Sequence, residues 1–183
     1  MGLNVFVLTG AGISAESGLG TFRDASGIWT RYDLSEVATP EGFARDPAKV
    51  RAFYNARRAN LASAAPNAAH VALARLQKGL AARGGRLFLC TQNVDDLHEQ
   101  GGCADVVHMH GQLRVTRCHA CQATWPDLEP LSADTACPRC QATGTARPSG
   151  GDPLQLAACA GAVRGGRLCR LSLIHISEPT RPY

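Results

Sequence analysis

The sequence predicts an α/β fold in which a parallel sheet is followed by a small zinc-binding module. A β-branched apolar run at 5–8 leads directly into a glycine-containing turn and a helical pattern. Strands and helices then alternate up to residue 107, and two Cys-x-x-Cys pairs follow. Alternating strands and helices are typical of parallel sheets, and paired Cys-x-x-Cys knuckles are typical of zinc modules.

The turn after the first strand reads Gly10-Ala11-Gly12-Ile13-Ser14-Ala15, which fits the pattern Gly-x-Gly-x-x-Ala. Between a strand and a helix this pattern favours a Rossmann-like dinucleotide site, because glycines let a pyrophosphate come close and helix N–H groups face it. A tight turn that binds no ligand is the alternative. The acidic residue that ordinary nicotinamide dehydrogenases carry about 20 residues further on is missing, since 21–29 reads as a polar loop. The sequence therefore favours a nucleotide site that does not serve ordinary hydride transfer.

Three helices are expected next. Thr39-Pro40 and Asp46-Pro47 predict two helix starts, and Pro66-Asn67 precedes a third. The side chains expected to face inward are Val50, Phe53 and Tyr54 in the second helix, and His70, Leu73 and Leu76 in the third, which ends near Gly79. Residues 86–91 then read as a buried strand, 94–100 as a short helix and 106–107 as a brief strand.

Polar side chains follow the second of these strands, at Gln92, Asn93 and Asp95. Ligands bind beyond the carboxyl ends of parallel strands, so we expect these side chains to face the glycine turn. The alternative is a polar loop in which Asn93 or Asp95 only caps the next helix. His108 and His110 follow at i, i+2, a spacing that fits either a metal pair or one structural and one catalytic histidine.

The most specific pattern is Cys118-x-x-Cys121, then fifteen residues, then Cys137-x-x-Cys140. Four thiolates form a closed tetrahedral shell, so we predict one structural Zn²⁺ and not a catalytic metal. Cys90 and Cys103 have no spaced partners and are expected to be ordinary small residues outside any disulfide.

Composition argues against several functional classes. The 183-residue chain has a net charge of +4 without a basic stripe, so nucleic acid is not an expected partner. It has no apolar run of about 20 residues and no secretory signal at its start, so no membrane partner is expected. Cysteines in metal-type spacing favour a reducing compartment, which predicts a cytoplasmic protein.

Five motifs together resemble those of the sirtuins, the family of NAD-dependent protein lysine deacylases, over about residues 3–148. They are Gly10-Ala11-Gly12-Ile13-Ser14, Thr21-Phe22-Arg23, Thr91-Gln92-Asn93-Val94-Asp95, His108-Met109-His110-Gly111 and the paired Cys-x-x-Cys. The resemblance implies that NAD is a cosubstrate, that succinyl, malonyl or acetyl groups are removed from protein lysines, and that nicotinamide and O-acyl-ADP-ribose are released. It also implies that His110 is the general base on a ribose hydroxyl. The implied NAD-binding residues are Gly10, Ala11, Gly12, Ser14, Ala15, Glu16, Thr21, Phe22, Arg23, Trp29, Gln92, Asn93, Val94 and Asp95.

The run Phe53-Tyr54-x-x-Arg57-Arg58 resembles the sirtuin class that removes acidic acyl groups. Tyr54 and Arg57 share a helix face, where a phenol and a guanidinium can bind the carboxylate of succinyl- or malonyl-lysine. The alternative is an ordinary amphipathic helix with Tyr54 half packed and Arg57 solvated. Arg58 faces elsewhere on a helix and is not assigned a role.

The chain departs from the sirtuin pattern after Pro148. Residues 149–170 are rich in Gly, Ala and Arg, and 171–181 resemble a translated sequencing adapter. We therefore expect three parts. Residues 1–112 form the N-terminal part of an incomplete Rossmann-like domain, including a helical segment at 39–79; 113–148 form the zinc-binding module; and 149–183 are a non-native, frameshifted tail. Missing strands predict an open sheet edge, poor solubility and little deacylase activity. The alternatives are a zinc-ribbon binding module without catalysis and an inert fragment.

Overall fold

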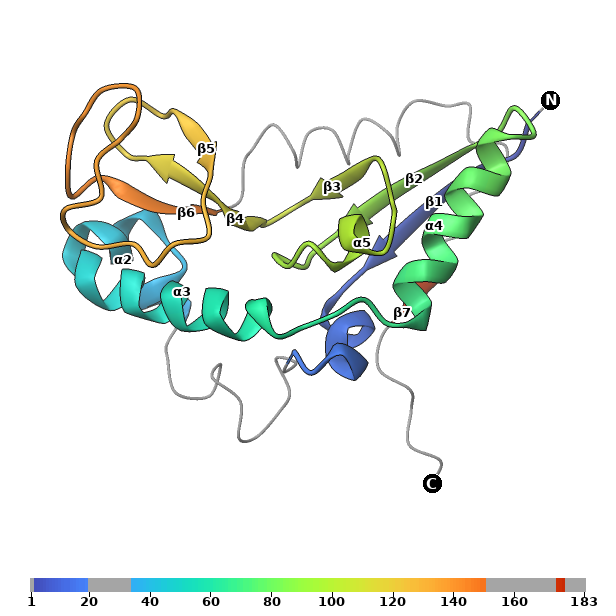
Figure 1. Cartoon of the computed structure of the whole chain (residues 1–183), viewed down its shortest axis with the longest axis horizontal. Helices are drawn as coiled ribbons and strands as arrows, with labels where there is room; N and C mark the ends of the chain where they lie inside the picture. Colours follow the sequence, from blue (N-terminus) through green and yellow to red (C-terminus); the bar gives the residue numbers. More distant parts are fainter. Residues whose placement is uncertain (1, 20–33, 151–173, 177–183) are drawn as a thin grey trace. The chain divides into compact units, whose positions relative to one another are not determined.

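The structure, a computed structural model, describes residues 2–19, 34–150 and 174–176 (Figure 1). The chain divides into two compact units. The described part of the first unit comprises 2–19, 64–110 and 174–176, and that of the second comprises 34–63 and 111–150. Among the described helices, none has the length and apolar character needed to cross a membrane.

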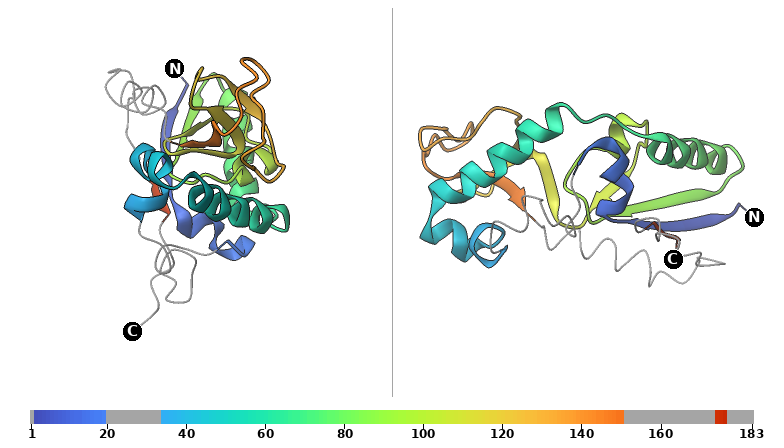
Figure 2. Two further views of the ribbon diagram at one scale, coloured as in Figure 1. Left: turned by 90° about the vertical axis from the view of Figure 1, so that its left-hand side faces the viewer. Right: turned by 90° about the horizontal axis from the view of Figure 1, so that it is seen from below.

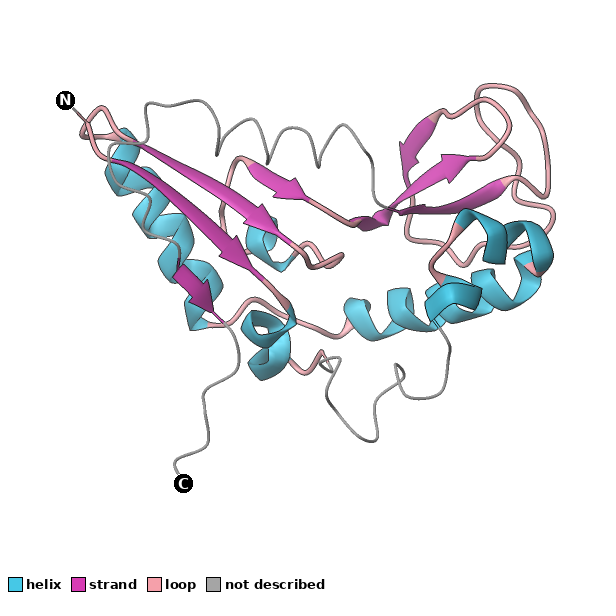
Figure 3. Cartoon of the chain, turned by 180° about the vertical axis from the view of Figure 1, so that it is seen from behind, coloured by secondary structure: helices cyan, strands magenta, loops and turns pink. Residues whose placement is uncertain are grey.

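The first unit contains a four-stranded sheet in the order β3-β2-β1-β7, in which every pairing is parallel (Figure 3). Its strands are β1 (Asn4–Thr9), β2 (Arg86–Thr91), β3 (Val106–His108) and β7 (Ile174–Ile176). The prediction of a parallel α/β sheet is confirmed, and the predicted strand at 86–91 has the observed bounds of β2. Strand β7 lies in the segment that was expected to be a non-native tail, and it pairs with β1 from Val7 to Thr9.

The core of this unit lies between the sheet and α4 (Ala68–Ala81), which runs along it (Figure 2). Alternate strand residues face α4, as a period of two requires. The buried members of this cluster are Val5, Val7, Ile13, Leu73, Ala74, Leu80, Leu87, Leu89 and Cys103. The other face of the sheet carries Phe6 stacked on Phe88, with ring centroids 5.6 Å apart. One predicted core position is wrong: Leu76 is 38% exposed, because Leu73, Ala74 and Leu80 supply the buried stripe of α4 instead.

The turn after β1 differs from the prediction in two ways. It continues into a seven-residue 3-10 helix, η1 (Ala11–Ser17), and the Ile13 N–H is already bonded to the Gly10 carbonyl at 3.1 Å. Gly10 itself has an extended backbone (φ −137°) that any residue can adopt. The left-handed conformation falls on Gly18 (φ 82°), which ends η1. A side chain at Gly10 would reach no atom closer than Gln92 Oε1 at 3.8 Å, so the space beside this residue is open.

Helix α5 (Leu97–Gln100) begins later than the predicted helix at 94–100. The reason is local: Asp95 Oδ1 accepts a hydrogen bond from the Leu97 N–H at 3.2 Å, which turns the chain into the helix at Leu97. Val94 and Asp95 therefore stay in the loop.

In the described part of the second unit, three helices accompany a three-stranded antiparallel sheet ordered β5-β4-β6. Its elements are α1 (Leu34–Val37), α2 (Pro40–Arg45), α3 (Pro47–Ala62), β4 (Gly111–Cys118), β5 (Thr124–Pro126) and β6 (Ala146–Gly150). The predicted helix starts are confirmed: Thr39 Oγ1 accepts from the Gly42 N–H at 3.0 Å, and Asp46 Oδ1 accepts from the Lys49 N–H at 2.9 Å. Strand β6 continues two residues past the predicted module boundary at 148 and pairs there with the start of β4.

Polar side chains of α3 bind the backbone of the cysteine-containing segment. Arg58, only 4% exposed, donates to the Leu113 carbonyl (2.8 Å), the Glu129 carbonyl (2.7 Å) and Thr116 Oγ1 (2.7 Å). Asn55 pairs in both directions with the backbone of Leu131, each bond measuring 2.9 Å. These contacts were not predicted, because most of the partners are backbone groups far away in the sequence.

Candidate functional site

The carboxyl ends of three neighbouring strands carry a row of buried polar residues. Thr9 is in register with Thr91, and Thr91 with His108. All three are 0% exposed. The hydroxyl of Thr9 lies 2.9 Å from His98 Nε2, and the hydroxyl of Thr91 accepts from the Asn93 N–H at 3.1 Å. This row fixes the loops that follow each strand.

Directly beyond the row, the structure brings together three of the predicted nucleotide-binding residues. Ser14 donates its hydroxyl hydrogen to Asp95 Oδ2 at 3.0 Å, and Asn93 Nδ2 donates to Ser14 Oγ at 2.9 Å. All three are nearly buried, with 2% exposure for Ser14, 8% for Asn93 and 6% for Asp95. We call Ser14, Asn93 and Asp95 the polar triad. The expectation that the loop after β2 faces the glycine turn is therefore met for Asn93 and Asp95. Asp95 also accepts from the Leu97 N–H, but the residue at the N-cap of α5 is Asp96, which makes no side-chain capping bond.

Burial dominates the electrostatics of the polar triad. It raises the pKa of Asp95 above its ordinary value, although the Leu97 N–H, the Ser14 hydroxyl and the nearby His108 act in the opposite direction. The ionised form of Asp95 is therefore stabilised by the hydrogen bonds from the Leu97 N–H and the Ser14 hydroxyl.

The two histidines predicted at i, i+2 do not form a metal pair. His108 is the last residue of β3, and both its ring nitrogens are occupied, Nδ1 by the Asn93 carbonyl (3.0 Å) and Nε2 by Glu99 Oε1 (2.7 Å). His110 lies past the strand end in a turn and is exposed. No hydrogen bond joins the His110 side chain to any described residue. His108 is therefore a histidine with a bonding partner at each nitrogen, and a catalytic role of His110 stays a prediction.

A second buried histidine contact was not predicted. His98 packs edge-on against His70, with centroids 4.9 Å apart. Burial first, and then the nearby His70 and His108, lower the pKa of His98 to about 3, so its ring is neutral and lies against Thr9. The sequence does not predict this contact, because no local pattern shows that His70 and His98 come together.

The remaining predicted nucleotide-binding residues divide into two groups. Gly10 precedes η1, which contains Ala11, Gly12, Ala15 and Glu16, and Gln92 and Val94 flank Asn93 in the loop after β2. Thr21, Phe22, Arg23 and Trp29 lie outside the described residues.

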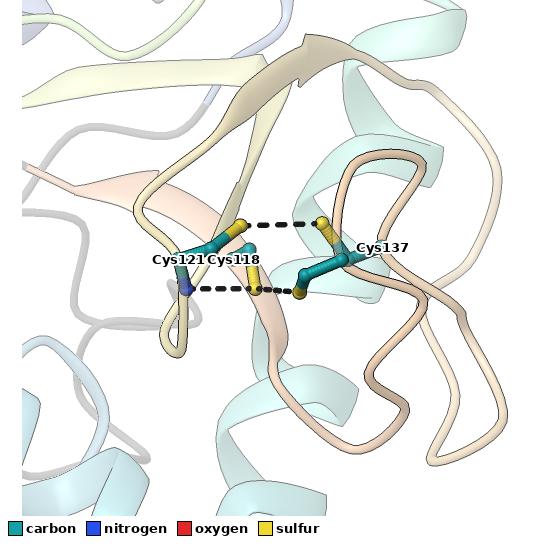
Figure 4. A group of neighbouring side chains, drawn as sticks. Cys118, Cys121 and Cys137 are labelled. Atoms are coloured by element: carbon teal, nitrogen blue, oxygen red, sulfur yellow. Dashed lines mark hydrogen bonds between the residues drawn. The ribbon is translucent and has the colours of Figure 1, made fainter.

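The four spaced cysteines converge in the second unit (Figure 4). Their sulfur atoms lie within 4.8 Å of one another. Cys118 Sγ is 3.7 Å from Cys140 Sγ, and Cys121 Sγ is 3.6 Å from Cys137 Sγ. A tetrahedron with zinc–sulfur bonds of about 2.3 Å has sulfur–sulfur edges of about 3.8 Å. The two measured pairs match this edge, and the four sulfurs could together hold one Zn²⁺.

The two knuckles have the same backbone geometry. The residue after each second cysteine, Gln122 or Gln141, has φ 60° and donates its N–H to the carbonyl of the first cysteine. Backbone N–H groups also point at sulfur, from Cys121 to Cys118 Sγ and from Arg139 to Cys137 Sγ, both at 3.4 Å. Burial alone would raise the pKa of Cys118, but the Thr145 hydroxyl and the backbone donors lower it to about 6. Cys140 differs: the Ala142 N–H acts to lower its pKa, but the neighbouring cysteines and burial raise it to about 12.

The two other described cysteines differ from each other. Cys103 is a buried free thiol, as expected. Cys90 takes part in a disulfide, so the expectation of an ordinary unpaired residue is wrong. Spacing rules find only partners close in sequence, which is why this bond was missed.

Tyr54 and Arg57 lie one turn apart on α3, both half-buried. Tyr54 packs edge-on against Phe53 at 5.1 Å, and the Arg57 guanidinium lies 5.6 Å from the centre of the same ring. Burial raises the pKa of Tyr54, while the positive charges of Arg57 and Arg147 act to lower it. A phenol with two positive charges nearby can help to bind an anion. Arg58 is turned away from them into the backbone contacts described above.

The profile of the Sir2 family matches residues 10–164, most of the chain. The chain belongs to the Sir2 family. The match begins at the glycine turn and includes the polar triad, His110 and the four zinc-site cysteines. It also continues past residue 148, where the sirtuin-like motifs end.

Curated Sir2-family relatives support this assignment. The chain is 73% identical over 146 residues to an NAD-dependent protein deacylase of Caulobacter vibrioides, covering 80% of this chain and 61% of that protein. It is 48% identical over 147 residues to an NAD-dependent protein deacylase of Leishmania major, covering 79% and 60%. The chain therefore spans about 60% of the length of these relatives.

Solved Sir2 structures share the fold. A complex of a Sir2 homolog with NAD superposes with a TM-score of 0.72 at 39% identity, covering 85% of this chain and 61% of that one. An ADP-ribose complex of a mutant Sir2 homologue gives a TM-score of 0.74 at 38% identity, covering 87% and 64%.

Proposed function

We propose that this chain provides the NAD-binding and proton-accepting residues of an NAD-dependent protein lysine deacylase. The observation that carries the proposal is the polar triad, which joins the turn after β1 to the loop after β2 at the carboxyl edge of the parallel sheet. Hydroxyl, amide and carboxylate groups in this position suit the ribose hydroxyls and the carboxamide of NAD. The known Sir2 complexes with NAD and ADP-ribose support the same ligand.

In the proposed reaction, the acyl oxygen of a modified lysine attacks the nicotinamide ribose of NAD, and the bond to nicotinamide breaks. His110 then accepts the proton of a ribose hydroxyl, whose oxygen bonds to the acyl carbon, so that free lysine and O-acyl-ADP-ribose result after addition of water. His110 suits this role because its ring is exposed and is not bonded to any described residue.

Tyr54 and Arg57 are proposed to select the acyl group. The phenol and the guanidinium would bind the distal carboxylate of a succinyl or malonyl group, which an acetyl group lacks. The support is their common position on one face of α3 and the charge of Arg147 nearby. The proposed substrates are therefore acylated lysines of proteins, with acidic acyl groups preferred.

Zinc is proposed to act only as a structural ion. Cys118, Cys121, Cys137 and Cys140 fill a tetrahedral shell, so no position is left for a reacting water. The four cysteines of this site are free thiols. The cytoplasmic location stays a prediction from the sequence, and the disulfide of Cys90 argues against strictly reducing surroundings.

Calorimetric titration of the zinc-loaded 183-residue chain with NAD tests the proposal. We expect measurable binding that Asp95→Asn weakens at least tenfold, while Asp105→Asn, the same change at an exposed site of the first unit, has no effect. Absence of NAD binding in a folded, zinc-loaded chain would favour the alternatives of a binding module or an inert fragment.

Turnover is measured in an extended version, in which residues 1–148 are followed by the remaining part of the Caulobacter relative. Its high identity makes this junction compatible with the fold. We expect NAD-dependent removal of acyl groups from lysine peptides, with release of nicotinamide.

A further inference from the structure

The buried His108 has no place in the reaction as proposed, yet it has the most complete set of hydrogen bonds of any histidine in the described part of the chain. Its side chain is 0% exposed. Nδ1 lies 3.0 Å from the backbone carbonyl of Asn93, and Nε2 lies 2.7 Å from Glu99 Oε1 on α5. One imidazole ring therefore connects the end of β3, the loop after β2 and α5.

The two acceptors fix the protonation state of this ring. A carbonyl oxygen and an ionised carboxylate can only accept, so both ring nitrogens must donate, and His108 must be an imidazolium. Burial alone would lower its pKa, but the hydrogen bond and charge of Glu99, the Asn93 carbonyl and the charge of Asp95 raise it overall. Of the other groups around it, His98 on α5 stays neutral, so Glu99 and Asp95 are its charged neighbours.

Asn93 is held at three points. Its N–H donates to Thr91 Oγ1, its side chain donates to Ser14 Oγ, and its carbonyl accepts from His108. The carbonyl contact links the polar triad through His108 to Glu99 of α5, in addition to the bond from the Leu97 N–H to Asp95. Without it, a nearly buried loop would have a carbonyl lacking its donor, and the Asn93 side chain would lose part of its orientation.

We propose that His108 is a positioning residue: bonded to Asn93 and Glu99 at once, it holds the polar triad in the geometry that binds the ribose of NAD. This inference rests on the proposed function. Loss of a hydrogen bond from a charged group corresponds to roughly 10–100-fold in an equilibrium constant. NAD affinity should therefore fall by about that factor when the ring is removed.

Imidazole NMR spectra of the 183-residue chain, labelled with ¹⁵N-histidine, test the protonation state. The His108 signals are assigned by their absence in His108→Gln. We expect both nitrogens of His108 to be protonated at pH 7, and the ring to lose a proton only as the pH rises through its raised pKa. A His108 ring with one unprotonated nitrogen at pH 7 would overturn the proposal.

Positioning is tested by amide hydrogen exchange and NAD titration of four variants. His108→Gln, which loses both ring contacts, should speed exchange at 93–97 and weaken NAD binding roughly 10–100-fold. Glu99→Leu, which loses only the contact at Nε2, should act in the same direction. The double variant should bind NAD no more weakly than His108→Gln, since Glu99 acts only through the ring. Glu99→Gln keeps an acceptor for Nε2 and should restore binding to within a few fold of the wild type. NAD affinity should also decline above the His108 pKa in the wild type, and not in His108→Gln.

The outcomes separate the positioning role from the proposed function. Wild-type NAD affinity and unchanged exchange in His108→Gln would overturn the positioning role. If the wild type itself bound no NAD, the proposed function would fail, and exchange at Asn93 and Asp95 would still decide whether His108 holds the loop. If His108→Gln failed to fold, the contrast between Glu99→Gln and Glu99→Leu would give the same decision, and equal behaviour of those two would overturn the proposal.

Discussion

Ser14→Ala is the change that tests the polar triad most sharply. It removes a donor to the buried Asp95 carboxylate and an acceptor for Asn93 Nδ2, two hydrogen bonds of 3.0 and 2.9 Å. A hydrogen bond to a charged group contributes about 1.5–3 kcal/mol and a neutral one about 1 kcal/mol. We therefore expect the first unit to lose about 2–4 kcal/mol of opening free energy, and NAD affinity to fall roughly 10–100-fold.

Ser17→Ala is the matched control in the same 3-10 helix. Ser17 Oγ only accepts one bond, from Asn67 Nδ2 at 3.1 Å. Its removal should cost about 0.5–1 kcal/mol and leave NAD binding unchanged. Native-state hydrogen exchange of the β1 and β2 amides measures the opening free energy, and calorimetry measures the affinity. Equal effects of the two substitutions would refute the reasoning.

The Ser14→Ala deficit should also depend on pH. Because burial raises the pKa of Asp95, the folded state loses stability as pH rises from the unfolded-state pKa of about 3.9 through the raised folded value. Ser14 counteracts this shift, so its removal raises the folded pKa further. The deficit should therefore be larger at pH 8 than at pH 4, and a deficit that grows toward acid pH would contradict this account.

Three further predictions concern the second unit. Chelation of the zinc-loaded chain should release one Zn²⁺ per chain and abolish exchange protection in β4 and β6 while β1 and β2 stay protected; retained protection would argue against a structural ion. Arg58→Met should destabilise this unit by about 3–5 kcal/mol in urea unfolding, because two buried acceptors and one partly buried acceptor lose their donor. Arg45→Met at an exposed position should change the stability by less than about 0.5 kcal/mol. In the extended version, Arg57→Met should abolish desuccinylation and spare deacetylation in a peptide assay; equal loss of both would reject the carboxylate site.

Much of the fold could be predicted because its signals are local. The β-branched run before Gly10 and the apolar run before Gln92 identify β1 and β2, and cap-plus-proline pairs place the starts of α2 and α3. The zinc site could also be predicted from local signals, because each knuckle is a four-residue Cys-x-x-Cys pattern.

What the sequence could not provide depends on contacts between distant segments. The bonds of Ser14 to residues about 80 positions away and the two bonds of His108 depend on strand register, which local patterns do not encode. Arg58 was assigned no role because two of its three acceptors are backbone carbonyls, which the side-chain pattern does not show. The disulfide of Cys90 was missed because Cys90 has no second cysteine at a characteristic spacing.

The measurement that tests the central claim most directly compares two steps of the reaction in the extended version with His110→Asn. If the His110 ring acts on the ribose after nicotinamide has left, exchange of labelled nicotinamide into NAD should persist, whereas formation of O-acyl-ADP-ribose should fall by roughly 10²–10⁴-fold. Full product formation without the ring would contradict the account, and so would loss of both steps in a variant that still binds NAD.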